Sequence, residues 1–172
     1  MKKVTMRMAA VLLVALFVVS SFQVTNVSAK SKSEKELYEN YIQGLWEKGY
    51  VVSDAVMRDI NLDGTKEMLV VYFPYEGANR ADGLVCTIKK GNVKMLKKFT
   101  GGVSFYYKSG KTIVVCIDSG GSEIKFITCK LSGSKLKVVT TYQSTADSYK
   151  KDQKRISEKT FINYMDSLKF II

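Results

Sequence analysis

The sequence predicts an α+β domain, in which an antiparallel β-meander of about eight strands is flanked by an N-terminal and a C-terminal helix. Three observations predict this class. Apolar residues recur at helical spacing at 37–46 and again at 161–168. Between these segments the period of the apolar pattern changes to two, and turn residues arrive every eight to ten positions. The meander is expected to form a curved sheet, a sandwich or a partly closed barrel.

Residues 1–29 are predicted to be a secretory signal peptide, and residues 30–172 a single α+β domain. Three basic residues precede an apolar run at 9–19, and small residues at 27–29 offer a cleavage site. The alternative is an uncleaved membrane anchor, but the run is shorter than the ~20 residues that a spanning helix needs. No cysteine adjoins the cleavage site, so lipid attachment is not expected there. We therefore expect a secreted, extracellular protein with no membrane span after signal cleavage.

The net charge of the chain restricts the classes of partner that it is expected to bind. The formal charge is +11, and signal cleavage lowers it to +8 because the removed segment holds three cations and no acid. Outside the cell, this charge favours an anionic envelope polymer, a glycan or a protein as partner. Nucleic acid is not expected, because the aromatic-plus-basic signatures of RNA and single-strand readers are missing. The lysines are scattered, so a solvated basic surface is the simpler interpretation. We expect a monomer.

The first helix starts at a capping box formed by Ser33 and Glu36, and Gly49 ends it. Trp46 and the tyrosines of its apolar stripe are expected to make core contacts rather than a ligand platform. The stripe consists of Leu37, Tyr38, Tyr41, Ile42, Leu45 and Trp46. A second helix, capped by Ser157, is expected to pack back on the sheet. Its apolar face consists of Phe161, Tyr164, Met165 and Leu168.

Two of the predicted strands, Met68–Phe73 and Ile113–Ile117, are apolar on both faces. They are therefore expected to be central strands, covered on both sides by a second sheet layer or by the helices. One more edge strand is expected around Tyr149. The eight predicted strands are Ser53–Arg58, Glu67–Phe73, Leu84–Lys89, Val93–Phe99, Val103–Tyr107, Thr112–Asp118, Glu123–Leu131 and Lys135–Tyr142.

The three cysteines, Cys86, Cys116 and Cys129, each lie in an apolar run, which favours burial as free thiols. A two-residue hairpin at Gly120-Gly121 would place Cys116 opposite Lys125 and set the Cys116 and Cys129 sulfurs too far apart for a disulfide bond. A disulfide would then need Cys86 as one partner, and none is expected. No C-x-x-C pair occurs.

The segment Asp59-Ile60-Asn61-Leu62-Asp63-Gly64-Thr65-Lys66-Glu67 has the ligand spacing of a calcium loop that leads into a β-strand. Asp59, Asn61 and Asp63 occupy loop positions 1, 3 and 5, and Gly64 takes the sharp turn. The Thr65 carbonyl fills position 7, and Glu67 at position 9 is expected to bind directly or through water. We predict a structural Ca²⁺ site here; the alternative is a plain Asp63-Gly64 hairpin turn with solvated carboxylates.

The loop resembles the D-x-D-x-D-G-x-x-D/E loops of dockerins and of FG-GAP integrin-type repeats, with Asn61 in place of the usual second aspartate. An EF-hand needs a bidentate glutamate at position 12, where this chain has Val70. A wider resemblance joins the D-I-x-x-D-G-x-x-E-x-L-V hairpin with the signal peptide, the capped helix, the Tyr-rich meander and an I-S-E-x-x-F closing helix. This set looks like a group of small secreted proteins of Gram-positive bacteria without an assigned activity, which implies location and fold rather than chemistry.

The chain has no histidine, which excludes Ser-His and Cys-His proteases and H-E-x-x-H metalloproteases. Asp118-Ser119-Gly120-Gly121 is therefore predicted to be a hairpin turn, although it mimics a protease nucleophile segment. We expect a non-catalytic secreted binding module, with exposed aromatics at Tyr72, Tyr75, Tyr106 and Tyr107. The alternative is a small extracellular hydrolase that uses carboxylates, with Asp118 and Glu123 approaching across the turn.

Overall fold

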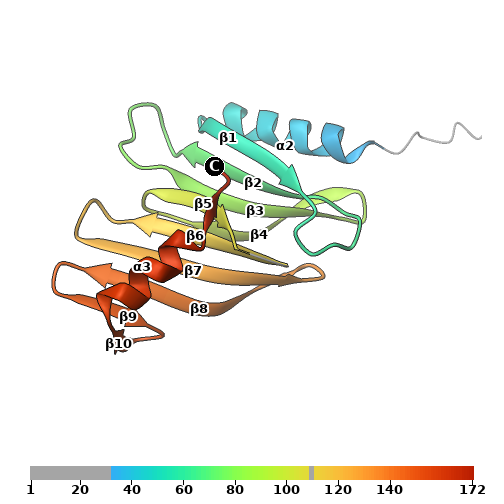
Figure 1. Cartoon of the computed structure of the whole chain (residues 1–172). Coiled ribbons are helices and arrows are strands. Elements are labelled where there is room, and N and C mark those ends of the chain that lie inside the picture. The colour runs from blue at the N-terminus through green and yellow to red at the C-terminus, as the bar shows by residue number, and fades with distance from the viewer. Residues whose placement is uncertain (1–31, 109–110) are drawn as a thin grey trace, which may run out of the picture. The chain divides into compact units, whose positions relative to one another are not determined.

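The computed structural model describes residues 32–108 and 111–172, so the predicted signal peptide lies outside the described residues. Within these ranges, two helices accompany eleven strands in two antiparallel sheets, which confirms the predicted α+β class (Figure 1). The helices are α2 (Glu34–Glu47) and α3 (Glu158–Asp166). The strands are β1 (Val51–Arg58), β2 (Glu67–Phe73), β3 (Asp82–Lys89), β4 (Asn92–Phe99), β5 (Val103–Tyr107), β6 (Thr112–Asp118), β7 (Glu123–Ser132), β8 (Lys135–Thr145), β9 (Ser148–Lys151), β10 (Lys154–Ile156) and β11 (Lys169–Phe170).

The described strands divide into a smaller and a larger sheet. Sheet A has the order β1-β2-β3-β4, and sheet B has the order β10-β9-β8-β7-β6-β5-β11. The two sheets pack face to face, with β5 against β2 and β3, and β4 against β8. Of the three arrangements that the sequence left open, the sandwich is the one that forms.

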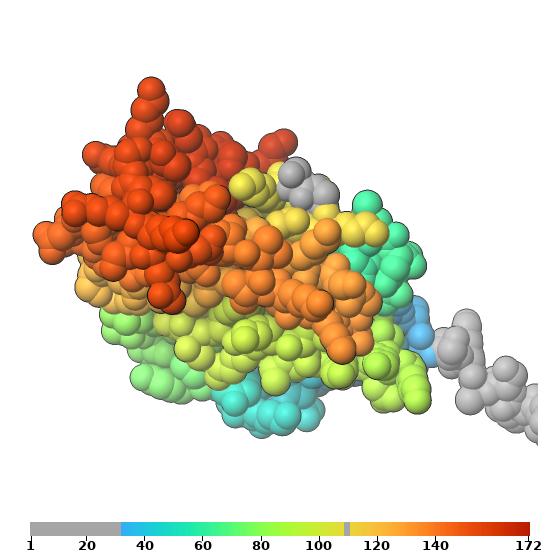
Figure 2. Space-filling model, turned by 90° about the horizontal axis from the view of Figure 1, so that it is seen from below, coloured from blue at the N-terminus to red at the C-terminus, as the bar shows by residue number. Residues whose placement is uncertain are grey.

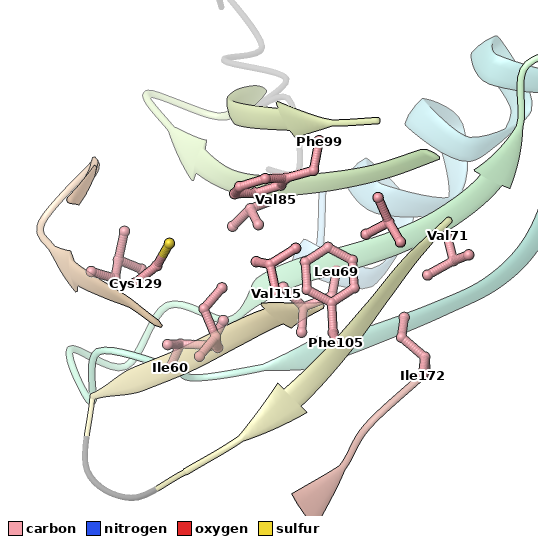
Figure 3. Close-up of a cluster of buried hydrophobic side chains, with 12 residues drawn as sticks. Ile60, Leu69, Val71, Val85, Phe99, Phe105, Val115, Cys129 and Ile172 are labelled. Carbon is pink, nitrogen blue, oxygen red and sulfur yellow. The ribbon is translucent and has the colours of Figure 1, made fainter. Parts of the chain in front are cut away.

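The inter-sheet core draws apolar side chains from both sheets (Figure 3). Leu69, Val85 and Phe99 enter it from sheet A, and Phe105 and Val115 enter it from sheet B. The sheets approach closely at Gly83, where an added Cβ would collide with the Val103 side chain and lie 3.0 Å from the Phe105 ring.

Each sheet also carries a helix on its outer face. Helix α2 packs Tyr38 and Leu45 on Met68, Val70 and neighbouring side chains of sheet A. Helix α3 packs Phe161 and Tyr164 on sheet B, in a second aromatic cluster that includes Phe126. In Figure 2, α2 (blue to cyan) and the C-terminal segments (red) lie on opposite sides. The central strands β2 and β6 are therefore covered by the other sheet on one face and by a helix on the other, as predicted.

The helix ends follow the predicted capping. The Ser33 hydroxyl accepts a hydrogen bond from the Glu36 amide at 3.2 Å, and the Ser157 hydroxyl accepts one from the Thr160 amide at 3.3 Å. Gly49 adopts φ +84° just beyond α2, a left-handed conformation that suits glycine. None of the described helices is long and apolar enough to cross a membrane.

The eight predicted strands all form, with small extensions at several ends. The polar segment around Tyr149 holds the two short strands β9 and β10 instead of one edge strand, and β11 adds to the far edge of sheet B. β11 pairs Phe170 with Tyr106 of β5, and the chain end beyond it contributes Ile172 to the inter-sheet core.

The predicted register of the β6–β7 hairpin is wrong by one residue. Lys125 lies opposite Ile117, and Cys116 lies opposite Phe126, because the turn is wider than the two glycines. The Asp118 carboxylate accepts hydrogen bonds from the Gly120 and Gly121 amides at 2.8 and 3.2 Å, which sets this wider turn. A one-residue change moves side chains to the other face of a strand.

All three cysteines lie in the part of the chain that the structure describes, so their pairing can be compared with the expectation that no disulfide forms. In residues 32–108 and 111–172, Cys86, Cys116 and Cys129 are unpaired and buried. Cys129 points into the inter-sheet core, whereas Cys116 points to the outer face beneath α3. The two sulfurs therefore lie on opposite faces of one sheet, and Cys129 is also three residues along β7 from Phe126, the partner of Cys116.

Candidate functional site

The predicted calcium loop connects β1 to β2 and is closed by its own backbone amides. The Asp59 carboxylate accepts hydrogen bonds from the Asp63 amide at 3.1 Å and from the Gly64 amide at 3.0 Å. The Asn61 side-chain oxygen accepts a second bond from the Asp63 amide at 2.9 Å. Positive φ values of 58° at Leu62 and 90° at Gly64 supply the two bends. The structure therefore gathers the predicted side chains at positions 1, 3 and 5 into one wrapped loop.

The Asp63 carboxylate connects the middle of the loop, at Asn61, to its C-terminal end, at Thr65. One carboxylate oxygen accepts from the Thr65 amide at 2.9 Å, and the other accepts from the Asn61 side-chain amide at 2.8 Å. Asn61 is buried, with an exposed fraction of 4%. The connection is longer than the two-residue turn of the alternative interpretation, because Arg58 is the residue that pairs with Glu67. Asp63 is exposed, so its carboxylate is both solvated and hydrogen-bonded.

Glu67 behaves differently from the other loop residues. Its side chain is fully buried at the first position of β2. One carboxylate oxygen accepts from the Ile60 amide at 3.0 Å, and the other accepts from the Thr87 hydroxyl at 3.1 Å. Burial raises the pKa of Glu67, while these two hydrogen bonds oppose the rise; Asp59 and Asp63 raise the pKa further through charge repulsion. Glu67 thus fastens the start of the loop to sheet A.

Calcium prefers oxygen ligands, and the side chains of this loop offer carboxylate, amide and hydroxyl oxygens. Each loop oxygen that accepts one hydrogen bond keeps a further lone pair. Across the described ranges, however, no three His, Cys, Asp or Glu side chains are arranged as a group that could hold a metal ion. Asp59, Asn61 and Asp63 fit an oxygen-ligand site by type and position, and both oxygens of Glu67 are engaged with the protein. Thr65 lies at the exit of the loop, where its amide donates to the Asp63 carboxylate.

Helix α2 is tied to the same loop. The Tyr38 hydroxyl donates a hydrogen bond to the Lys66 carbonyl at 2.5 Å, one residue before Glu67. Burial raises the pKa of Tyr38, and the nearby Glu67 charge adds to the rise. The loop is therefore held by sheet A and by a helix that packs on it.

A second candidate site lies on sheet B, on its inner face, which we define as the face toward sheet A. Ile127 of β7 and Leu136 of β8 pack in the inter-sheet core on this face. Farther along the same strands, polar side chains replace apolar ones and line a hollow of about 460 Å³. We call this the basic hollow. Its lining residues are Lys125, Thr141, Gln143, Lys150, Asp152 and Gln153.

Strand register places the two lysines of the basic hollow in a row with the neighbouring Arg155. Lys125 of β7 pairs with Gln143 of β8, Gln143 pairs with Lys150 of β9, and Lys150 pairs with Arg155 of β10. The Glu123 carboxylate offsets part of the positive charge of this row, because it lies 3.2 Å from the Lys125 ammonium. Sequence reasoning missed the row because its members are separated by up to thirty positions and only strand pairing aligns them.

Asp152 shapes the rim of the basic hollow. It lies in the β9–β10 turn, where Asp152 and Gln153 adopt φ values of 48° and 68°. Its carboxylate accepts from the Thr140 hydroxyl at 2.6 Å and from the Thr141 amide at 2.8 Å. These hydrogen bonds, the hydroxyl first, lower the pKa of Asp152, which keeps it ionised.

The carboxylates of the hydrolase alternative do not converge. Strand alternation assigns Asp118 to the face of sheet B that carries Cys116, and Glu123 to the face that carries Lys125. Asp118 is exposed and is engaged by the turn amides, and Glu123 is paired with Lys125. The two side chains therefore lie on opposite faces.

Two predictions about aromatic side chains are wrong. Trp46 was expected in the core, but it is 53% exposed beside a groove between α2 and β1. Tyr72 was expected at the surface, but it is 2% exposed and packs edge-on against Tyr50. Tyr75 is exposed as predicted, whereas Tyr106 and Tyr107 are half-buried. Trp46 misses the core because it lies at the border of the α2 stripe, whose centre is Tyr38 and Leu45.

Comparison of the chain with protein-family models, with curated proteins and with solved structures returns no match. The function of the protein is therefore inferred from the Asp59–Glu67 loop and the basic hollow.

Proposed function

We propose that this protein is a secreted, non-catalytic binding module for an anionic partner, an envelope polymer or a glycan, with a calcium ion holding its first hairpin. The observation that carries the binding role is the basic hollow, where ammonium, amide and hydroxyl groups from β7, β8 and β9 face one space. A formal charge of +11, or +8 after loss of the three cations in residues 1–29, favours the approach of anions from a distance.

The binding proposal is tested with soluble anionic polymers. We expect saturable binding that persists at physiological ionic strength, where a Debye length of about 8 Å screens diffuse attraction between charges. The polymer should keep its chain length after prolonged incubation, as measured by size-exclusion chromatography. A neutral dextran is the matched control. Failure of every carboxylated, sulfated and phosphorylated polymer to bind would contradict the proposal, and shortening of the polymer would favour a hydrolase.

The calcium proposal is supported by the wrapped loop, in which Asp59, Asn61 and Asp63 present oxygens within a closed turn. When bound, a calcium ion would neutralise the loop carboxylates and hold the two ends of the β1–β2 loop together. Asp59, Asn61 and Asp63 would hold it, because their side chains share the loop. The ion is a structural staple in this proposal, and no step of partner binding passes through it.

Calcium is expected to raise the melting temperature by about 3–6 °C. A site with a dissociation constant of ~10⁻⁴ M adds about 1.4 kcal/mol to the free energy of unfolding in ~1 mM calcium. For a domain of this size, that gain gives the stated shift in thermal unfolding followed by circular dichroism. The Asp63→Ala variant should melt at the same temperature with calcium and with a chelator.

Asp147→Ala is the matched control for this experiment, because Asp147 is an exposed acid in the β8–β9 turn. It should keep the full calcium response. Equal melting temperatures of the unaltered protein in calcium and in chelator would contradict the calcium proposal and leave the binding proposal standing.

A further inference from the structure

We propose that the basic hollow binds an acidic glycan, namely a linear polysaccharide with carboxylate groups on its sugar rings. This inference rests on the proposed binding function and names its ligand class and its residues. The hollow, at about 460 Å³, falls within the ~300–1,000 Å³ range of small-ligand sites, which is enough for a short stretch of a polymer.

The cation row suits acidic groups repeated along a chain. Lys125 and Lys150 are separated by β8, so their backbones lie about 10 Å apart, or two interstrand spacings. Arg155 continues the row by one further strand. Gln143 lies between the two lysines and offers an amide donor and an amide acceptor. A polymer that crosses the strands would meet a cation, an amide and a second cation in turn.

The acids of the hollow favour a glycan over a polyphosphate. Asp152 forms part of the lining, and Glu123 pairs with Lys125. A densely charged phosphate chain would meet like-charge repulsion from both carboxylates. A sugar acid carries one charge per ring and several hydroxyl groups, and a hydroxyl donates well to a carboxylate such as Asp152. The lining therefore matches a ligand that carries both groups: its lysines suit the carboxylates of the ligand, and its carboxylate suits the hydroxyl groups.

The aromatic side chains of this part of sheet B face away from the hollow. Tyr142 and Tyr149 lie in the outer cluster, where Tyr142 stacks on Tyr164 with ring centroids 3.7 Å apart. The lining residues include no aromatic ring on which a base would stack. Single-stranded nucleic acid depends on such stacking, so this surface does not suit it.

The test uses isothermal titration of the purified protein with a linear oligogalacturonate, with inorganic polyphosphate of equal total charge, and with neutral dextran. We expect the oligogalacturonate to bind more tightly than polyphosphate, and dextran not to bind. The double variant Lys125→Gln/Lys150→Gln should lose affinity for oligogalacturonate by about tenfold or more, because two charge-assisted contacts are removed.

The matched control is Lys137→Gln/Lys159→Gln, which removes the same charge from exposed lysines on β8 and α3 that do not line the hollow. Its affinity for oligogalacturonate should change by less than about twofold, since exposed charges at a distance are screened. Equal losses in the two double variants would overturn the assignment of the hollow. Thermal unfolding of both variants verifies that each is folded.

The Gln143→Ala variant separates glycan recognition from simple charge attraction, because it keeps the net charge. It should weaken oligogalacturonate binding by about three- to tenfold through the loss of an amide contact, and leave polyphosphate binding unchanged. Polyphosphate binding as tight as oligogalacturonate binding would overturn the glycan inference while the binding function stands. If no anionic polymer binds at all, the proposed function itself fails.

Discussion

Replacing Phe105 by alanine is expected to lower the free energy of unfolding by about 3–5 kcal/mol. The Phe105 side chain is fully buried between the sheets, where its ring meets Phe99 edge-on with centroids 6.4 Å apart. On another side it lies against Gly83, which has no side chain to fill a cavity. The neighbouring groups therefore cannot move in to fill the cavity that the lost ring leaves, which places the loss of unfolding free energy toward the upper end of this range. Urea denaturation measures it.

Val139→Ala is the control for the Phe105 experiment, because Val139 is 59% exposed on β8. Its free energy of unfolding should change by less than about 0.5 kcal/mol, as is usual for surface substitutions. A loss at Phe105 no larger than the loss at Val139 would mean that the two sheets do not share the interior core.

Glu67 provides the second large effect. A Glu67→Leu variant is expected to be about 2–5 kcal/mol less stable than Glu67→Gln, because leucine leaves the buried Ile60 amide and Thr87 hydroxyl without their acceptor. Glutamine keeps both hydrogen bonds: its oxygen accepts from the Ile60 amide, and its amide donates to the Thr87 hydroxyl. Urea denaturation in the presence of a chelator measures the difference. Equal stability of the two variants would contradict the role of Glu67 as the fastening of the loop.

The unaltered protein and the Glu67→Gln variant together report the direction of the pKa shift of Glu67. Burial raises its folded-state pKa above the ordinary value of 4.5, so protons bind more tightly to the folded protein. The stability gained from protonation is full below pH 4.5 and is lost as the pH rises through the folded-state pKa. Relative to Glu67→Gln, the unaltered protein should therefore become more stable as the pH falls from 7 to 4.5. A flat difference across this range would contradict the raised pKa.

Much of the fold could be predicted because its signals are local. The bounds Glu67–Phe73, Val103–Tyr107 and Thr112–Asp118 agree with β2, β5 and β6, since turn residues and an apolar period of two mark strand ends directly. The caps at Ser33 and Ser157 depend on residues within one helical turn. Such features need no knowledge of what packs on them.

Predictions were less successful where they depended on which other part of the chain packs against or pairs with a segment. Trp46 and Tyr72 exchanged their expected environments, because burial depends on the centre of the helix stripe and on which face of β2 lies beneath α2. The β6–β7 register depended on how the Asp118 carboxylate closes the turn. The basic hollow depended entirely on strand pairing, since Lys125 is far from Lys150 along the chain.

The sequence alone determined the α+β class, the strands and their central members, and the oxygen-rich composition of the Asp59–Glu67 loop, because these follow from neighbouring residues and backbone propensity. The tertiary structure alone decided that the strands divide into two facing sheets, that each sheet receives a helix on its outer side, and that Glu67 is buried. It also decided that distant cations align across β7, β9 and β10. These features arise from apolar surfaces and strand edges that find their partners only when the whole chain packs, and the acidic-glycan proposal depends on that packing.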